Sequence, residues 1–427
     1  MKEYAGRVLM LVEGNFPADT RVRNEAFTLA KNGFRVSVIA LRGATETPRE
    51  IVNGVSVYRV PRITIFKKLP AAESSRGRAL LRKLQVVIGY FLEHSYFTSA
   101  CLLASFYVTA TEGFDVVHAH NPPDTLVVVG AIHRIFGKKF VFDHHDLSPE
   151  LYLSRYRKAT DGLVSRSLRL LEKLSLKLAD IAIATNESYR AIAIRRHAIN
   201  PDKVFVVRNG PDLSRVRIVE RDSSLMSMGR TILGYVGAMN PQDGIDYLLR
   251  ALGHLVHDLK RTDFYCVLIG DGDSREELES LALELGLADY VRFTGFISDE
   301  EMMRYLSTAD ICLDPNPSSP LNDVSTWIKV MEYMALGKPI VSFDLKETRV
   351  SAGDAALYVT PNDEFEFARA IARLMEDPTR RSQMGAYGST RVRDELNWNV
   401  TSQNLLKAYH RLFAEPPTSG PGHTRDA

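Results

Sequence analysis

The sequence predicts an α/β protein built from two doubly wound, parallel-sheet domains in tandem. The chain has 427 residues, too long for one ordinary domain and enough for two. Short apolar segments alternate with segments of helical spacing from end to end, which indicates parallel sheets covered on both faces. This alternation restarts near residue 230, after a polar and irregular segment at 212–229.

In the first half, the apolar segments predicted as strands are residues 7–12, 36–41, 55–60, 115–120, 139–145, 180–185 and 203–209. A helical pattern follows the first of them, with apolar residues at Val22, Ala26 and Leu29, and it ends at Asn32-Gly33. We expect the first domain to comprise residues 1–212.

In the second half, the predicted strands are residues 231–237, 264–272, 290–296, 310–315, 338–344 and 355–360. They define a second domain at 229–396. Residues 397–414 form an amphipathic pattern that predicts a final helix, and residues 415–427 are rich in Pro, Gly and Thr, which predicts a disordered tail.

The composition is that of an ordinary globular protein, with 45% hydrophobic and 25% charged residues. This excludes disordered, collagen-like and disulfide-scaffold classes. The three cysteines lie in apolar segments, which indicates reduced core residues. No signal peptide or bilayer-spanning segment is predicted. We therefore expect a cytoplasmic protein, with peripheral contact at the inner face of the cell membrane as an option.

The net charge of +2 conceals an asymmetry, because residues 1–220 carry 33 basic and 21 acidic residues, and the rest carry 21 and 31. A basic first half favours an anionic partner. Eight basic residues and one acid lie between Arg59 and Lys83, followed by a very apolar segment at 84–110. This pattern predicts contact of residues 59–110 with an anionic membrane. The alternative is a buried helix beside a solvated loop.

Ligands of parallel α/β sheets bind at the carboxyl ends of strands. A turn with Gly14 follows the first predicted strand, without the G-x-G-x-x-G pattern of dinucleotide-binding enzymes. His118 and His120 end another strand, and we expect one to face the sheet interior and the other the cleft. Asp143, His144, His145 and Asp146 end the next strand; zinc is the alternative interpretation, although no established ligand spacing is present.

A Pro- and Ser-rich loop at 315–327 leads into a predicted helix that ends at Gly337. Ser325 and Thr326 before this helix are typical of a phosphate-binding loop. Lys329 and Glu332 lie three residues apart, so they can share one face of the helix. An i,i+3 ion pair between them is the alternative reading.

These segments resemble family 4 of the retaining nucleotide-sugar glycosyltransferases, which have two facing Rossmann-like domains, the GT-B fold. In the first half, the resemblance is carried by DTRVRNEAFTLAKNGFRVSVIA, FDVVHAHNPPD and FDHHDLSPELY. In the second half it is carried by ILGYVGAMNPQDGIDYLLRAL, VLIGDGDSREELESLALELGL and KVMEYMALGKPIV. The resemblance implies the GT-B fold, with helix 397–414 crossing back onto the first domain.

The resemblance also implies roles for individual residues. His120 would lie near the transferred sugar, Gly14 near the diphosphate, and Glu332 at the nucleotide ribose. We predict His120 and Glu332 as catalytic. The predicted donor-binding residues are Gly14, Arg208, Asn209, Gly237, Ser325, Thr326, Lys329 and Glu332. The predicted acceptor-binding residues are Asp19, Arg21, His145, Asp146 and Glu150.

The sequence departs from the family pattern at three positions. The first glutamate of the Glu-x7-Glu motif is replaced by Val324, and the basic residues expected to hold the diphosphate are replaced by Ala238 and Asp243. A leaving diphosphate needs positive charge or dipoles. Lys329, Arg208 and the amides near Ser325 are the expected substitutes.

The resulting hypothesis is a retaining, metal-independent hexosyltransferase. It would move a sugar from a nucleotide-diphosphate co-substrate to a glycan or polyprenyl-diphosphate-linked acceptor, in surface polysaccharide assembly. No further cofactor and no nucleic acid are expected. The alternatives are a nucleotide-sugar epimerase or hydrolase on the same fold, and a non-catalytic nucleotide-sugar-binding relative.

Overall fold

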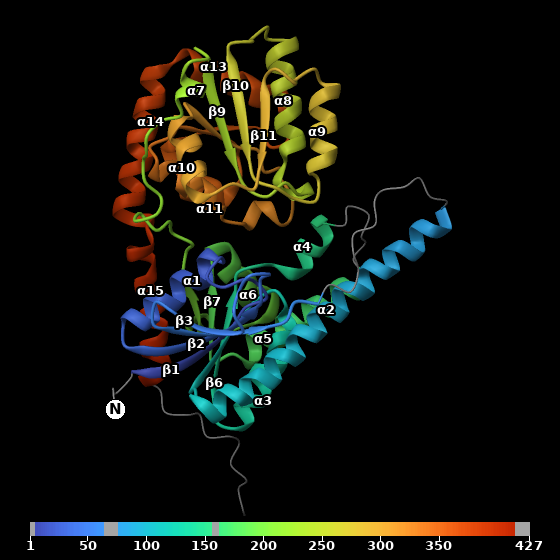
Figure 1. The fold of residues 1–427 in the computed structure, drawn as a ribbon, viewed down its shortest axis with the longest axis vertical. Helices are drawn as coiled ribbons and strands as arrows, with labels where there is room; N and C mark the ends of the chain where they lie inside the picture. Colours follow the sequence, from blue (N-terminus) through green and yellow to red (C-terminus); the bar gives the residue numbers. More distant parts are fainter. Residues whose placement is uncertain (1–4, 64–75, 156–161, 415–427) are drawn as a thin grey trace, which may run out of the picture. The chain divides into compact units, whose positions relative to one another are not determined.

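A computed structural model describes residues 5–63, 76–155 and 162–414 of the chain (Figure 1). It divides into two compact units. Unit 1 comprises residues 1–149, 161–207 and 402–427, and unit 2 comprises residues 150–160 and 208–401. The tail predicted at 415–427 lies outside the described residues, as do Lys67 and Lys68 of the basic stretch.

Unit 1 is built on an eight-stranded sheet of order β3-β4-β2-β1-β5-β6-β7-β8. The strands are β1 (Gly6–Leu11), β2 (Phe34–Leu41), β3 (Arg49–Val52), β4 (Val55–Val60), β5 (Val116–His120), β6 (Lys139–His144), β7 (Ile181–Ala184) and β8 (Val204–Val206). The sheet is parallel except for β3, which pairs antiparallel with β4 at the edge. Strand β3 was not predicted, because its four residues are exposed or half-buried and form no apolar run.

The helices of unit 1 fill the predicted gaps between strands. They are α1 (Thr20–Lys31), α2 (Arg76–Thr111), α3 (Val127–Ile135), α5 (Leu163–Leu178) and α6 (Glu187–His197), with α4 (Ser148–Arg155) at the boundary of the two units. Helix α1 begins at Thr20 because the Asp19 side chain accepts a hydrogen bond from the Val22 amide. Helix α2 is one continuous element of 36 residues, although no helix in the described part of the chain is long and apolar enough to cross a membrane.

Unit 2 is built on a six-stranded, parallel sheet of order β11-β10-β9-β12-β13-β14. Its strands are β9 (Thr231–Val236), β10 (Phe264–Ile269), β11 (Val291–Gly295), β12 (Ile311–Asp314), β13 (Ile340–Phe343) and β14 (Ala356–Val359). Its helices are α7 (Ser223–Met226), α8 (Ile245–His257), α9 (Arg275–Glu284), α10 (Asp299–Thr308), α11 (Ile328–Ala335), α12 (Lys346–Ala352), α13 (Glu364–Glu376) and α14 (Pro378–Arg391). Apolar side chains of strands and helices form buried clusters on both faces of the sheet, as predicted for a doubly wound fold.

The last helix, α15 (Trp398–Ala414), begins in unit 2 and belongs to unit 1 from Ser402 onward. Its rings pack into unit 1, where Tyr409 and Phe413 contact Phe34 with ring centroids 5.4 and 5.7 Å apart. The final helix therefore completes the core of the first domain, as predicted for a crossover helix.

Candidate active site

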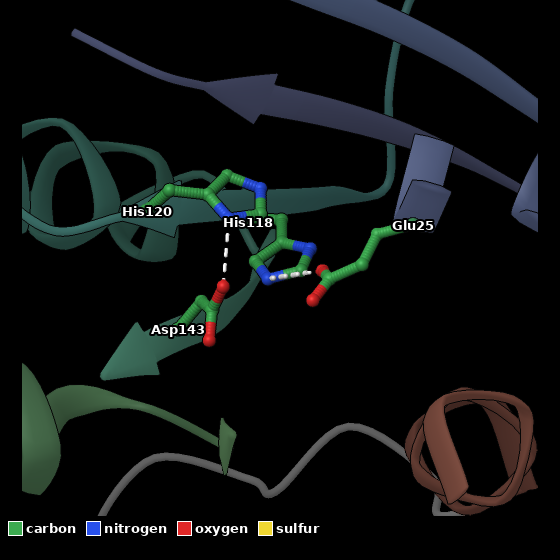
Figure 2. Close-up of side chains that lie close together, drawn as sticks. All are labelled: Glu25, His118, His120 and Asp143. Atoms are coloured by element: carbon green, nitrogen blue, oxygen red, sulfur yellow. Dashed lines mark hydrogen bonds and ion pairs between the residues drawn. The ribbon is translucent and has the colours of Figure 1, made fainter. Parts of the chain in front are cut away.

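Four buried ionisable side chains meet toward the carboxyl ends of strands β5 and β6 in unit 1 (Figure 2). His118 and His120 come from β5, Asp143 from β6 and Glu25 from helix α1. One nitrogen or oxygen atom of each residue lies within 4.8 Å of the others. We call these four residues the buried cluster.

The two histidines of the buried cluster lie on the same side of the sheet. Their ring centroids are 4.2 Å apart, and the rings are inclined by 30°. The expectation that His118 and His120 face opposite sides is wrong, because residues i and i+2 of a strand point to the same face.

Asp143 joins the cluster to its counter-ion. Its carboxylate accepts hydrogen bonds from Arg21 Nε and Nη2 at 2.7 and 2.6 Å. It also lies 2.9 Å from His120 Nδ1 and 3.2 Å from His145 Nδ1. Burial acts to raise the pKa of Asp143, but the Arg21 charge and these hydrogen bonds outweigh it and hold the pKa well below its ordinary value. Asp143 is therefore ionised.

Glu25 is the second carboxyl group of the cluster, and its pKa is shifted in the opposite direction. Its side chain is fully buried, and Arg21 Nη2 lies 3.2 Å from Oε1. Burial and the neighbouring Asp143 charge raise the pKa of Glu25 to about 8. One guanidinium thus neutralises one carboxylate, and Glu25 holds a proton at neutral pH.

His120 presents an unused acceptor. Burial lowers the pKa of His120, so its ring is neutral, and the short contact with Asp143 assigns the proton to Nδ1. The other ring nitrogen, Nε2, is buried and has no hydrogen-bond partner among the described residues. A buried acceptor without a partner costs about 1–3 kcal/mol, so a ligand hydroxyl that donates to Nε2 would be bound favourably.

The residue types of the buried cluster are those that bind zinc and similar cations. Their fit to a divalent cation is poor for one reason. The guanidinium of Arg21 already lies between the Asp143 and Glu25 carboxyl groups, and Asp143 is saturated with donors. A cation would have to displace Arg21 or share its carboxylates with another positive charge.

Among the predicted acceptor residues, Arg21 needs correction. It is buried, and its guanidinium is bonded to Asp143 and to the carbonyl oxygen of Val207, so it holds the cluster together from inside. Asp19 caps helix α1, His145 lies against Asp143, and Asp146 accepts from Asn121 through its carbonyl oxygen. Gly14 lies in the turn after β1, and Glu150 lies on α4.

In unit 2, Lys329 lies among acidic and aromatic side chains at the carboxyl ends of β9 and β12. Its ammonium group is 3.4 Å from Asp314 and lies over the rings of Tyr235 and Trp327 at 4.8 and 5.3 Å. Its charge also opposes the rise in the pKa of Asp243 that burial causes. The structure thus places the Lys329 charge beside Asp243, one of the two positions at which the family pattern has a basic residue.

Glu332 and Lys329 do not form the ion pair considered from their spacing. Burial raises the pKa of Glu332 to about 7, and the charged groups that act on it are Arg215 and Asp299. Asp299 is the first residue of α10, so Glu332 lies toward the loop that follows β11.

The remaining predicted donor residues lie in loops of unit 2. The Ser325 hydroxyl donates to the Leu321 carbonyl, Thr326 lies 3.5 Å from Glu347, and helix α11 begins two residues later at Ile328. Arg208 donates to Ser351 at 2.9 Å, and Asn209 follows it. Gly237 directly follows β9, where a Cβ atom would lie 2.7 Å from the Tyr235 hydroxyl.

Two family models match the chain, one for each half. The glycosyl transferase 4-like domain matches residues 18–210, and the domain of glycosyl transferases group 1 matches residues 230–377. The chain is a glycosyltransferase built from these two domains. Each matched segment contains one of the sites described above, since His120 lies in the first and Lys329 in the second.

Relatives of this glycosyltransferase include an uncharacterized glycosyltransferase of Methanocaldococcus jannaschii, 23% identical over 85% of this chain and 96% of the relative. A D-inositol 3-phosphate glycosyltransferase of Frankia alni is 27% identical over 70% of this chain and 75% of the relative.

Solved structures share the fold at lower sequence identity. Sucrose-phosphate synthase from Thermosynechococcus elongatus aligns with a TM-score of 0.74 at 20% identity, covering 96% of this chain and 99% of that protein. Anabaena HepE in complex with UDP and glucose aligns with a TM-score of 0.68 at 17% identity, covering 95% and 99%. The glycosyltransferase therefore has the GT-B fold.

Several residues of the two sites in this glycosyltransferase were not predicted from the sequence. Glu25 is the clearest case, and a signal for it exists: Arg21 and Glu25 are spaced i,i+4 among the apolar residues that face the core from α1. No local signal marks Tyr409, whose hydroxyl lies 2.9 Å from His118 Nδ1 although the two residues are 291 positions apart.

Proposed function

We propose that this glycosyltransferase is a retaining, metal-independent hexosyltransferase of family 4. It takes a nucleotide-diphosphate sugar as donor and a glycan or lipid-linked glycan as acceptor, with a role in surface polysaccharide assembly. Unit 2 binds the nucleotide diphosphate, and unit 1 supplies His120 and the acceptor site.

The observation that carries this proposal is the state of His120. The ring is neutral, Asp143 fixes its orientation, and Nε2 is left without a partner among the described residues. A sugar is dense in hydroxyl groups, so it offers a donor to this nitrogen in any pose that reaches it. A neutral acceptor held in place positions a substrate hydroxyl without taking its proton at neutral pH.

Lys329 is proposed to stabilise the leaving diphosphate. Its charge lies beside Asp243 and Asp314, at the carboxyl ends of the unit 2 strands. Positive charge at the leaving group is needed because the departing diphosphate gains negative charge as the bond to the sugar breaks. The metal-free mechanism rests on this lysine, because the Arg21 charge is already balanced by Asp143 within the buried cluster.

A lipid-linked acceptor is proposed from the basic stretch at 59–83, with membrane contact through residues 59–110. Arg59 has to be removed from that stretch, because it is buried in β4 and pairs with Glu46 and Glu50. Arg62 donates to Asn15 at 2.8 Å.

The proposal is tested by incubating the full chain with a set of nucleotide-diphosphate sugars and with soluble or polyprenyl-diphosphate-linked glycans. We expect release of nucleoside diphosphate that depends on the acceptor and persists in EDTA, and a product whose anomeric configuration, measured by NMR, matches the donor. Inversion or dependence on a metal would contradict the mechanism.

The alternatives give different outcomes in the same experiment. Free sugar or an isomerised donor without acceptor would indicate a hydrolase or an epimerase. Binding without turnover would indicate a non-catalytic relative. Thermal unfolding identifies the donor, because a ligand at 100 times its dissociation constant stabilises the protein by about 2.7 kcal/mol.

A further inference from the structure

Helix α5 of unit 1 has a partly polar buried face and leucines on its exposed face. Three of its buried residues are polar: Ser165, Glu172 and Ser175. Three of its exposed residues are leucines: Leu163, Leu170 and Leu174, with exposed fractions of 82%, 56% and 40%. Side chains in globular proteins are usually apolar inside and polar outside, so buried polar groups and clustered exposed apolar groups point to a structural or binding role.

The buried polar residues have a structural explanation. The Glu172 carboxylate lies 2.9 Å from His144 Nε2 and 2.6 Å from His197 Nε2, and it accepts from Arg196 at 3.2 Å. Internal hydrogen bonds of this kind satisfy a buried carboxylate. The exposed leucines have no comparable explanation inside the unit.

The three leucines form one stripe. They are separated by seven and four residues, so at 3.6 residues per turn they fall within about 40° of one another around the helix axis. Glu172 and Leu168 mark the opposite, buried side. The stripe therefore points directly away from the core.

Helices α2 and α3 also expose apolar side chains. Helix α3 packs against both α2 and α5 (Figure 1). At its end, Ile135 and Phe136 are 82% and 63% exposed, and Phe136 meets the exposed Phe106 of α2 with ring centroids 6.4 Å apart. All three helices run toward the amino edge of the sheet, because each is followed by the next parallel strand.

The same surface is basic. On α5, Arg166, Lys173 and Lys177 are exposed beside the leucine stripe, and the one acidic residue of this helix, Glu172, is buried. None of these three basic residues pairs with a carboxylate of the described residues. Apolar side chains flanked by unpaired cations complement a lipid surface with anionic headgroups better than they complement water.

We propose that this surface, made by Phe106, Ile135, Phe136, Leu163, Leu170 and Leu174 with the three cations of α5, docks on a bilayer that contains anionic lipid. It adds the exposed faces of α3 and α5 to the membrane contact proposed for residues 59–110, to which Phe106 already belongs. The inference rests on the proposed function only in that a lipid-linked acceptor would give the docking a purpose.

Vesicle flotation tests the proposal with the full chain. The wild type should float with phosphatidylcholine vesicles that contain phosphatidylglycerol, and not with phosphatidylcholine alone. Replacing Arg166, Lys173 and Lys177 by Gln should weaken partitioning roughly 100-fold at low salt, with a smaller effect at high salt. Replacing the three leucines by Gln should weaken it roughly tenfold or more at every salt concentration, because apolar insertion is not screened.

The control is Ile51→Gln, which removes an apolar side chain that is 76% exposed from edge strand β3 of the same unit. It should float like the wild type. A variant with Arg76, Arg78, Arg82 and Lys83 replaced by Gln separates this surface from the basic stretch, because the binding that remains in it should fall further when the three α5 leucines are also replaced.

Three outcomes would overturn the inference. They are a wild type that stays in solution with anionic vesicles, α5 variants that bind as the wild type does, and a wild-type dimer in sedimentation that the leucine variant dissociates without any vesicle binding. Transfer to a soluble acceptor is measured on the same samples. It should be unchanged in all variants, so a failure of docking and a failure of the proposed transferase function are distinguishable.

Discussion

Replacing Glu25 by Gln should make the protein more stable in mild alkali. Glu25 is fully buried, and its pKa rises from an ordinary 4.5 to about 8 in the folded protein. Between these values the folded state holds a proton that the unfolded state has released. Stability therefore falls as pH rises, at up to about 1.4 kcal/mol per pH unit for this group.

The amide of Gln is neutral at every pH and close in shape to the protonated carboxyl group. The difference in unfolding free energy between Glu25→Gln and the wild type should therefore be small near pH 4.5 and grow in favour of the variant up to about pH 8. Integrated over that interval the gain approaches roughly 5 kcal/mol, as an upper value for a group that cannot relax.

Urea unfolding at closely spaced pH values measures this difference, and Glu112→Gln is the matched control. Burial acts to raise the pKa of Glu112, but hydrogen bonds from Tyr58 and Ser37 and the charge of Arg35 outweigh it and lower the pKa. The Glu112→Gln substitution should lower the free energy of unfolding at neutral pH, and this loss should disappear in acid, where Glu112 of the wild type is protonated. A Glu25→Gln difference that does not change between pH 5 and 8 would refute the argument that Glu25 holds a proton.

Four further predictions concern single residues. His120→Ala should retain nucleotide affinity in calorimetry and lower turnover roughly 5- to 150-fold, and a defect explained wholly by nucleotide binding would remove its role at the sugar. Lys329→Ala should weaken donor binding about 10- to 150-fold, whereas Lys338→Ala, which removes a half-buried lysine bonded to the Ser307 carbonyl, should not. Tyr409→Phe leaves His118 Nδ1 without its partner, so urea unfolding should show a loss of about 1–3 kcal/mol, and an unchanged stability would contradict that hydrogen bond. Gly244→Ala should lower the melting temperature far more than Gly229→Ala, although both residues have positive φ. The new Cβ would lie 2.1 Å from the Pro315 carbonyl oxygen at Gly244, whereas at Gly229 it would meet nothing within 4 Å.

The sequence was sufficient to predict the parallel strands of both sheets, because strands buried on both faces are continuous apolar runs that need no partner to be recognised. Edge strand β3 was missed for the converse reason: Arg49 and Ile51 are exposed, and the strand exists only through its pairing with β4.

At the site, His120 could be predicted because it ends a strand within a recognisable motif. The pairing of Asp143 with Arg21 could not, since 122 residues separate them and their contact depends on how α1 packs on the sheet. The same holds for Lys329. Its spacing suggests Glu332 as partner, but packing gives it Asp314, 15 residues earlier on β12.

Helix α15 has a consequence for how the protein is made. The Phe413 ring packs so closely on β1 that a Cβ atom at Gly6 would lie 2.3 Å from it. The Tyr409 hydroxyl forms a hydrogen bond with His118, so the first strand and the last helix share one core. The ribosome therefore synthesises almost the whole chain before the core of the amino-terminal domain can be completed. A protein truncated after residue 207 would lack the helix that covers Phe34 and His118, and it would be prone to aggregation. Isolated amino-terminal domains of this protein should therefore be produced with residues 402–414 supplied, either fused through a linker or as a second chain.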